Sequence, residues 1–412
     1  MRKLLLLLVM VFIFFSCSPV DTSDDKKNPG SQETGNLDPA DPTDPTDPAQ
    51  QLKTAAAAVR EMKLGVNIGN SFDSLNSNNI AGQTGWGNPG VSQNYIKSLK
   101  THGFITVRFP VTWADYIGAA PDYTVNVTWM AQVKRVVDWI LAEGMYCILN
   151  VHHDGADIVN KSWIEEIRFV EKEQEILEKF ESLWRQIADS FNYASDKLVF
   201  EGMNEPQFDK LWNRGNNTGD KTRAFYLLNT LNQKFVDTVR GTEGNNATRL
   251  LLIPSYWTDI TNTIDNWGTF FNMPTDTISN RMILSFHYYT PWNFCGGNST
   301  TWGTAGNKTE LDNLFNRVKT SVIDIGIPVI IGEYAVNINT NDGAVSGTQK
   351  NSAARVDWML SVTQKCIDLG ICPILWDTGM RANNKGMADV ERASPFGIST
   401  DLRAMIDGVV WR

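Results

Sequence analysis

Eight short apolar runs recur along the chain after residue 51, and stretches with helical patterns separate them. Each run is about as long as a strand, is rich in β-branched or aromatic residues, and lacks strict alternation of apolar and polar positions. Strands of this kind are typical of parallel sheets that are covered by helices on their faces. The runs are 63–69, 104–110, 145–151, 198–204, 249–255, 282–289, 327–334 and 371–377.

The intervening stretches have the apolar period of an α-helix. Residues 129–141 and 176–191 each place their apolar side chains on one face. A further helix is predicted to end at Leu369, because Gly370 stands where a left-handed cap is usual. Eight such units can close into a barrel. We therefore predict an α/β fold, a (β/α)8 TIM barrel forming a single catalytic domain over residues 52–412, with an open doubly wound sheet as the alternative.

The amino-terminal end has the pattern of an export signal. Two basic residues precede an apolar run, Leu4–Phe15, that is too short to span a bilayer. Ser16 and Cys17 follow, which resembles a bacterial lipoprotein signal. We expect residues 1–17 to be a lipoprotein-type signal peptide that ends at a lipidated Cys17, with an ordinary signal cleaved near Ser16 as the alternative. Acyl chains on Cys17 would anchor an exported lipoprotein to the outer membrane or cell surface.

Residues 18–51 are rich in Asp, Pro and Thr and carry hardly any apolar side chains. Such a segment cannot bury enough surface to offset its ordering entropy, so we expect a disordered tether. The first fifty residues contain eight acidic and four basic groups, which leaves about five of the nine excess negative charges for the remainder. That balance argues against nucleic acid as a partner.

The cysteines after Cys17 do not form a disulfide framework or a metal-binding motif. Cys147 and Cys372 lie inside apolar runs and are predicted to be core residues. A single bridge that involves Cys295 or Cys366 stays open at this point.

Polar and aromatic residues collect at the carboxyl ends of the predicted strands, which form the functional face of a barrel of this kind. Three of the four histidines in the chain stand there. Any one buried His or Arg is more often a satisfied core group than a catalyst, but the joint pattern indicates one shared site. The residues are Asn67, Asn70, Arg108, His152, His153, Asp154, Asn204, Glu205, Trp257, His287, Tyr289, Glu333, Trp376 and Asp377.

Two of the four carboxylates in this group, Glu205 and Glu333, lie on opposite sides of the predicted barrel. Glu205 follows the fourth run and Glu333 lies in the seventh, so closure would bring them to facing sides of one pocket. Glycosidic hydrolysis uses such a pair, one as a proton donor and one as a nucleophile or base, with different pKa values. Pro206 is expected to end the strand ladder beside Glu205, and Asn204 to donate a hydrogen bond to a sugar 2-hydroxyl.

Eight ordered motifs resemble those of glycoside hydrolase family 5, the cellulase family. They are "GVNIGNSFD", "WGNP", "GFITVRFPVTW", "NVHHD", "FEGMNEP", "FHYYTPW", "IIGEYA" and "LWDTG". The resemblance implies retaining hydrolysis without a cofactor or metal ion, with Glu205 as general acid/base and Glu333 as nucleophile. Many members carry Arg or His after the N-E-P triplet, where this chain has Gln207, which concerns local loop contacts only.

The same resemblance implies supporting roles for the other residues. Arg108 and Tyr289 would hold the nucleophile ionised and oriented, and His287 would set the protonation of the acid/base. His152 is favoured for the contact with the cleaved sugar because neighbouring residues on a strand point to opposite faces, and His153 stays open as the alternative. The expected substrate-binding residues are Trp376 as the stacking floor, Asn204 at the 2-hydroxyl, and Asn70, His153 and Trp257.

The motifs look most like the endoglucanase and xyloglucanase branch of the family, so a β-1,4-glucan polysaccharide (cellulose, mixed-linkage β-glucan or xyloglucan) is the expected substrate. A xylanase or mannanase of the same family is one alternative. A tethered glycan-binding protein without activity is another, because the chain has fourteen Trp. A metal enzyme with His152, His153, Asp154 and Glu205 as ligands is disfavoured, since no H-E-x-x-H motif occurs. We expect a monomer.

The tryptophans divide into two groups by position. Those within helical patterns are predicted to belong to the core, and those after strands or in loops are candidate sugar platforms. The first group is Trp139, Trp184 and Trp358, and the second is Trp113, Trp163, Trp257, Trp292 and Trp302.

Overall fold

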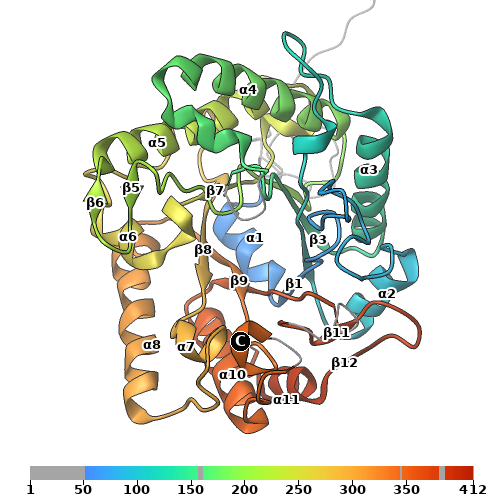
Figure 1. Cartoon of the computed structure of the whole chain (residues 1–412), viewed down its shortest axis with the longest axis vertical. Coiled ribbons are helices and arrows are strands. Elements are labelled where there is room, and N and C mark those ends of the chain that lie inside the picture. Colours follow the sequence, from blue (N-terminus) through green and yellow to red (C-terminus); the bar gives the residue numbers. More distant parts are fainter. Residues whose placement is uncertain (1–51, 156–160, 344–345, 380–385, 412) are drawn as a thin grey trace, which may run out of the picture. The chain divides into compact units, whose positions relative to one another are not determined.

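Eight parallel strands close into a barrel in the order β1-β10-β9-β8-β7-β4-β3-β2 (Figure 1). Each predicted apolar run contains one of these strands, so the (β/α)8 barrel is confirmed and the doubly wound sheet is wrong. The strands are β1 (Gly65–Asn67), β2 (Thr106–Phe109), β3 (Tyr146–Asn150), β4 (Leu198–Glu201), β7 (Leu251–Pro254), β8 (Met282–Tyr288), β9 (Val329–Tyr334) and β10 (Cys372–Leu375).

The computed structural model describes residues 52–155, 161–343, 346–379 and 386–411. The barrel and its helices belong to one unit, Leu52–Arg412. The predicted signal peptide, the lipidated Cys17 and the tether over residues 18–51 lie outside the described residues. Among the helices of the described part of the chain, none is long and apolar enough to cross a membrane.

Helices surround the barrel and lie between successive strands (Figure 1). The predicted face over 129–141 is buried in α3, and the Asn126 side chain caps this helix by accepting from the Trp129 backbone N–H. The helices are α1 (Ala55–Met62), α2 (Gln93–Thr101), α3 (Val127–Ala142), α4 (Glu173–Ser190), α5 (Lys221–Arg240), α6 (Ile260–Asp265), α7 (Trp292–Cys295), α8 (Ala305–Val318), α9 (Thr340–Gly343), α10 (Ser352–Asp368) and α11 (Thr400–Gly408).

One end of the barrel is closed by α1. Ala58 and Met62 of this helix are fully buried against the inward side chains of the strands, and the Met62 carbonyl accepts a hydrogen bond from Thr106 at the start of β2. Burial of each large apolar side chain contributes about 1.5–3 kcal/mol. The inward cluster is Tyr146, Ile148, Val199, Leu250, Leu252, Ile283, Ile330, Cys372 and Ile374. Function is therefore confined to the opposite end, where the strands finish.

Two details of the sequence prediction concern α10 and the cysteines. α10 ends at Asp368, and Gly370 has a φ of 72°, the left-handed conformation expected there. Cys147 and Cys372 are buried as predicted, and Cys295 and Cys366 are also buried and free, so neither forms the bridge that the sequence left open.

Small antiparallel pairs of strands extend the loops at the functional end. One is β5 (Trp212–Asn213) with β6 (Thr218–Gly219), which follows β4 in the chain. The other is β11 (Val390–Glu391) with β12 (Gly397–Ile398), which follows β10. Both hairpins come directly after barrel strands that carry predicted site residues.

Candidate active site

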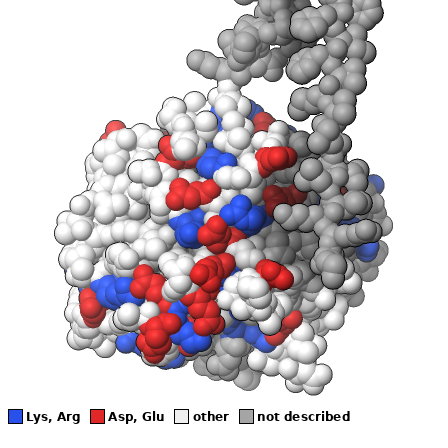
Figure 2. Space-filling model, turned by 90° about the horizontal axis from the view of Figure 1, so that it is seen from above, with Lys and Arg blue, Asp and Glu red and all other residues white. Residues whose placement is uncertain are grey.

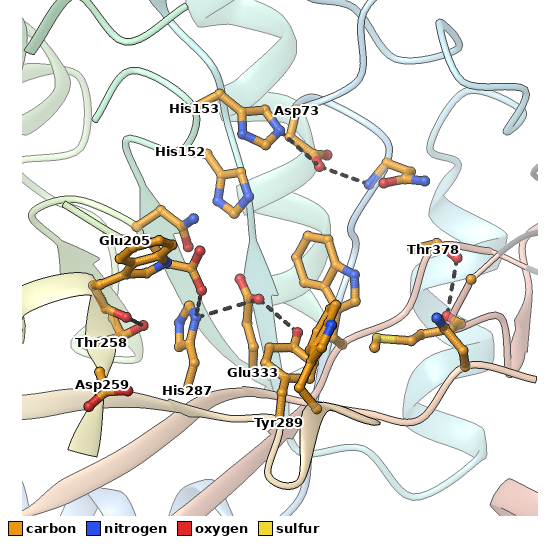
Figure 3. A pocket seen from close by; sticks show the side chains of 18 of the residues that line it. Asp73, His152, His153, Glu205, Thr258, Asp259, His287, Tyr289, Glu333 and Thr378 are labelled. Atoms are coloured by element: carbon orange, nitrogen blue, oxygen red, sulfur yellow. Dashed lines mark hydrogen bonds and ion pairs between the residues drawn. The ribbon is translucent and has the colours of Figure 1, made fainter. Parts of the chain in front are cut away.

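A cavity of about 810 Å³ opens where the barrel strands finish. Figure 3 shows that Glu205, His287, Tyr289 and Glu333 point into it. Three members of the predicted shared site, Asn67, Asp154 and Asp377, are buried and do not line this cavity. Every residue to which the family resemblance gave a role in catalysis or substrate binding lines it, except Arg108, which is buried beneath it. These residues are Asn70, His152, His153, Asn204, Glu205, Trp257, His287, Tyr289, Glu333 and Trp376.

Glu333 is held by two donors. It lies near the end of β9, where its carboxylate accepts from Arg108 Nη1 at 2.8 Å and from the Tyr289 hydroxyl at 2.9 Å. Its side chain is 7% exposed. Burial raises the pKa of Glu333, whereas His287 and Arg108 oppose that rise. A cation and a hydroxyl on one carboxylate fix its orientation and favour its charged form.

Arg108, on β2, joins four side chains beneath the cavity. Its Nε donates to Glu201 at 2.7 Å, and its Nη2 donates to Asn204 Oδ1 at 2.7 Å. Nη1 also donates to Asn67 Oδ1 at 2.9 Å. Although burial opposes its charge, the carboxylates of Glu201 and Glu333 raise the pKa of Arg108. The guanidinium is therefore a fixed cation that contacts a carboxylate on β4, Glu201, and one on β9, Glu333.

The Asn204 contact leaves its amide N–H groups free to face the cavity. Because the Oδ1 atom is turned toward Arg108, the Nδ2 amide group is the part of the side chain that is left to face the cavity. An Asn held in this way acts as a donor. This orientation suits the predicted hydrogen bond to a sugar hydroxyl.

Glu205 lies beyond β4 and contacts a histidine. Its Oε1 is 2.6 Å from His287 Nδ1. Burial raises the pKa of Glu205 to about 7, and the charges of Arg108 and Arg214 limit the rise. Burial also lowers the pKa of His287 to about 4, so this imidazole is neutral near pH 7. A neutral His beside a carboxyl with a raised pKa keeps a proton available for transfer.

The prediction that Pro206 ends the strand ladder is wrong. β4 ends at Glu201, four residues before Glu205. Gly202 then passes so close to α5 that a Cβ there would lie 3.0 Å from the ring of Phe235. The Gly202 carbonyl accepts from the indole N–H of Trp184 at 3.1 Å, so the segment that carries Glu205 is fixed from the helix side.

The two carboxylates are close together. One oxygen of Glu205, one of Glu333 and a ring nitrogen of His287 all lie within 4.8 Å of one another. Retaining glycosidases have carboxyl groups about 5–5.5 Å apart, whereas inverting enzymes need about 6.5–9.5 Å to admit a water molecule. The spacing leaves room for direct attack on a sugar and matches the retaining arrangement.

A flat surface lies beside the carboxylates. The rings of Trp376 and His152 are stacked with centroids 5.7 Å apart and planes at 3°. Gly69 makes this possible, because a Cβ there would come within 2.8 Å of the Trp376 ring. His152 Nδ1 is 3.1 Å from Asn150 Nδ2, and burial lowers its pKa well below the ordinary value. Neutral His152 and the indole together suit the recognition of a sugar ring.

Comparison with known proteins supports one family. The model of the family described as cellulase (glycosyl hydrolase family 5) matches residues 41–381. The chain belongs to glycoside hydrolase family 5.

Individual members of family 5 resemble the chain over most of its length. It is 35% identical to endoglucanase A of Paenibacillus barcinonensis over 353 residues, 80% of this chain and 84% of the relative. It is 30% identical to a xyloglucan-specific endo-beta-1,4-glucanase of Bacteroides ovatus over 77% of this chain and 64% of that protein.

Solved structures of family 5 members show the same barrel. A family 5 xyloglucanase from Paenibacillus pabuli superposes with a TM-score of 0.75 and 34% identity over 85% of this chain and 99% of that one. A broad-specificity endoglucanase of subfamily 4 from Bacteroides salanitronis gives 0.76 and 31% over 86% and 94%.

Both histidines of the "HHD" motif of this family 5 chain line the cavity, so the alternation argument against His153 is wrong. β3 ends at Asn150, and residues beyond the strand no longer alternate between faces. His153 Nε2 is 3.9 Å from Asp73 Oδ2, and its ring is 5.9 Å from that of Trp86. Burial lowers the pKa of His153 to about 4.

Several residues in and beneath the cavity were not predicted as part of the family 5 site. Glu201 was missed although it is a lone carboxylate in an apolar strand, a signal that was present in the sequence. Trp86 and Asp73 lie in the quoted motifs "WGNP" and "GVNIGNSFD", but nothing in their spacing marks a ligand contact. Arg214, Asp259 and Thr378 come from loops whose conformation one sequence does not reveal.

The candidate platforms differ in their surroundings. Trp257 and Trp292 line the cavity. Trp113 is fully buried and donates to the Asn150 carbonyl, and Trp302 is buried, so neither offers a face to a sugar. Trp163 donates to Asp154 at 2.7 Å outside the cavity. Trp184 and Trp358 are in the core as predicted, and Trp139 packs against it.

Two groups in the described residues have the types and spacing of metal ligands. Asp73, His152 and His153 form one, with their ligand atoms within 4.8 Å of one another. The other consists of Glu205, His287 and Glu333, which already contact one another. Catalysis by Glu205 and Glu333 needs both carboxylates free of a bound metal ion. The effect of a chelator on activity therefore distinguishes this chemistry from that of a metal enzyme.

Proposed function

We propose that the protein is an endo-acting β-1,4-glucanase that cleaves by double displacement with retention of configuration. The observation that carries this proposal is the approach of the Glu205 and Glu333 oxygens to within 4.8 Å inside a cavity lined by stacking residues. Separations of that size favour a covalent glycosyl-enzyme over direct attack by water.

Two steps follow from the contacts of the pair. In the first, a Glu333 oxygen attacks the anomeric carbon while Glu205 gives its proton to the departing glycosidic oxygen. In the second, Glu205 takes a proton from water, the water oxygen attacks the same carbon, and the ester bond to Glu333 breaks. Arg108 and Tyr289 stabilise the negative charge that returns to Glu333. His287 Nδ1 accepts a hydrogen bond from Glu205 when this carboxyl is protonated and donates one to it when it is ionised.

The substrate is proposed from the relatives and from the site together. These relatives are named as endoglucanases and xyloglucan-specific enzymes. Trp86, Trp257 and Trp292 also line the cavity, which suits a chain of several sugars. We therefore place cellulose, mixed-linkage β-glucan and xyloglucan first, and keep xylan and mannan as alternatives.

The amino-terminal residues support a proposal about location. The basic residues, the Leu4–Phe15 run and Cys17 favour export as a lipoprotein, with residues 18–51 as a tether. A membrane-anchored enzyme at the outer membrane or cell surface would act on polysaccharide outside the cell as a monomer. Loss of membrane association after Cys17→Ser would support the anchor, and unchanged membrane retention would contradict it.

Product analysis tests the reaction. The purified protein is incubated with β-glucan, carboxymethyl-cellulose, xyloglucan, xylan and mannan, with and without EDTA, and proton NMR follows the anomeric configuration of the first products. Internal cleavage of β-1,4-glucans to β-configured ends, insensitive to EDTA, is expected. Binding without cleavage would favour the glycan-binding alternative, and α-configured products would exclude double displacement.

The pH dependence of kcat/KM is predicted to be bell-shaped with a mildly acidic optimum. Glu205 must be protonated, and its pKa of about 7 places the fall on the basic side near that pH. Glu333 must be ionised, and burial raises its pKa, so the fall on the acidic side begins at a higher pH than for an exposed Glu. Initial rates on a soluble β-glucan measure this, and an undiminished rate above about pH 8 would contradict it.

A further inference from the structure

Arg214 stands on the turn between β5 and β6 and lines the cavity. Its guanidinium carbon lies 3.6 Å from the ring centroid of Trp257. Its Nη1 donates to Asp259 Oδ2 at 2.6 Å. The hairpin after β4 thus covers one face of an indole that belongs to the loop after β7, and a carboxylate two residues later fixes the cation in place.

The backbone of Trp257 needs such support. Trp257 and Thr258 have φ values of 51° and 48°, two consecutive left-handed residues that are not glycine. Conformations of this kind persist only where the surroundings enforce them. The Trp257 N–H donates to the Pro206 carbonyl at 2.8 Å, which binds this loop to the residue that follows Glu205. This backbone hydrogen bond therefore fixes the position of Trp257 relative to Glu205.

We propose that Arg214 is a positioning residue for the leaving-group side of the cleft, where it holds Trp257 as the stacking platform for the sugar that departs. This inference rests on the proposed hydrolysis and adds a residue to it. Because the guanidinium occupies one face of the indole, the other face is left for the sugar. A stacked cation also strengthens the rigid placement of the ring.

The assignment to the leaving-group side follows from the position of Glu205. A general acid must reach the glycosidic oxygen, so the departing sugar lies on the flank of the acid. Figure 3 shows Thr258 and Asp259 on the same side of the pocket as Glu205, whereas Asp73 and Thr378 lie on other sides. The sugar that becomes attached to Glu333 lies instead by Trp376 and His152.

Arg214 has a second influence, through charge. Its guanidinium lowers the pKa of Glu205 against the effect of burial. The other ionisable groups that face Glu205 are His287, Arg108, Glu333 and Tyr289. Removal of the Arg214 charge leaves all of these in place and favours the protonated form of Glu205. The basic side of the pH profile should then move to higher pH.

Two substrates separate the platform from the chemistry. Cellotetraose needs sugar binding on both sides of the cleaved bond, whereas β-cellobiosyl fluoride has no sugar on the leaving-group side. For Arg214→Gln we expect kcat/KM for cellotetraose to fall about tenfold more than for the fluoride, mainly through KM. Arg214→Lys keeps the charge but not the planar stack, so it should retain the wild-type pH profile and still show the loss on cellotetraose.

Arg223→Gln is the matched control. Arg223 also stacks on an aromatic ring, 5.2 Å from that of Tyr226, and pairs with Glu173 at 2.6 Å, but it is on α5 and does not line the cavity. It should keep the wild-type ratio of the two substrates. Thermal unfolding of all three variants shows whether any loss comes from instability.

Three outcomes would overturn the inference. Equal fold-losses of Arg214→Gln on both substrates would indicate a general structural role, and wild-type kcat/KM on both substrates would show that Trp257 needs no support. If the wild-type protein cleaves neither substrate, calorimetry of cellotetraose binding replaces kinetics, because a glycan-binding protein would still lose affinity in Arg214→Gln. Unchanged affinity of Arg214→Gln for cellotetraose, or no binding by the wild type, would contradict both the role of Arg214 and that of Trp257 as a sugar platform.

Discussion

Replacement of Glu333 by Gln is expected to lower kcat/KM on β-glucan by at least about 10⁴-fold while the fold stays intact. The amide has the shape of the carboxylate and can still accept from Arg108, but it has no charge with which to attack an anomeric carbon. Binding of cellotetraose should survive, since Trp376 and His152 form the stacking surface beside it.

The fold should tolerate this change because of Glu201. Loss of one partner from a buried ion pair usually costs about 3–5 kcal/mol, since the other charge is left uncompensated. Here Arg108 keeps its 2.7 Å contact with Glu201 and its bonds to Asn67 and Asn204. The melting temperature should therefore change little. By the same reasoning, the positive charge of Arg108 is shared between Glu201 and Glu333 and is not balanced by Glu333 alone.

Glu181→Gln is a suitable control for Glu333→Gln. Glu181 pairs with Arg185 and Lys234 on the surface, so its loss removes two ion-pair contacts without touching the cavity. It should keep full activity. In addition, a 2-fluoro-cellobioside with a good leaving group should label the wild type at Glu333, as peptide mass spectrometry can show. Substantial residual turnover in Glu333→Gln, or a label elsewhere, would contradict the role.

The barrel was predictable because the sequence patterns of its strands and of its helices are both local. Strands that are buried on two faces appear as short apolar runs, and helices such as α3 bury one face at the helical period. Closure of the sheet then brings every carboxyl end to one mouth, which is why the sequence alone predicts that residues as far apart as Arg108 and Glu333 share a site.

The parts that escaped prediction depend on contacts between distant segments. Whether His153 faces the cavity depends on where β3 ends, and that is set by pairing with neighbouring strands. The burial of Trp113 depends on its bond to the Asn150 carbonyl. The support of Trp257 by Arg214 joins loops that follow two different strands. No local pattern in one sequence encodes these contacts.

Replacement of Glu205 by Ala should produce a loss that depends on the leaving group. Proton donation is worth about 10²–10⁴-fold, so hydrolysis of β-glucan should fall by about that factor. An aryl cellobioside with an acidic phenol needs no proton, and its first step should be almost unimpaired. Its second step should become limiting, because Glu205 also activates water. The expected signature is a burst of phenol followed by slow turnover.

Azide should rescue the second step of Glu205→Ala, and the reason lies in the surroundings of the missing carboxylate. The vacated site lies near Arg108 and Arg214, whose charges already act on Glu205, so a small anion is attracted there. Azide needs no base and would attack the glycosyl-enzyme from the face that water uses. The product would be a β-cellobiosyl azide, which NMR identifies, because two successive inversions restore the configuration. Glu333→Gln should gain nothing from azide, since it forms no glycosyl-enzyme. Equal losses on all substrates, or an α-configured azide, would mean that Glu205 is not the acid/base of a double displacement.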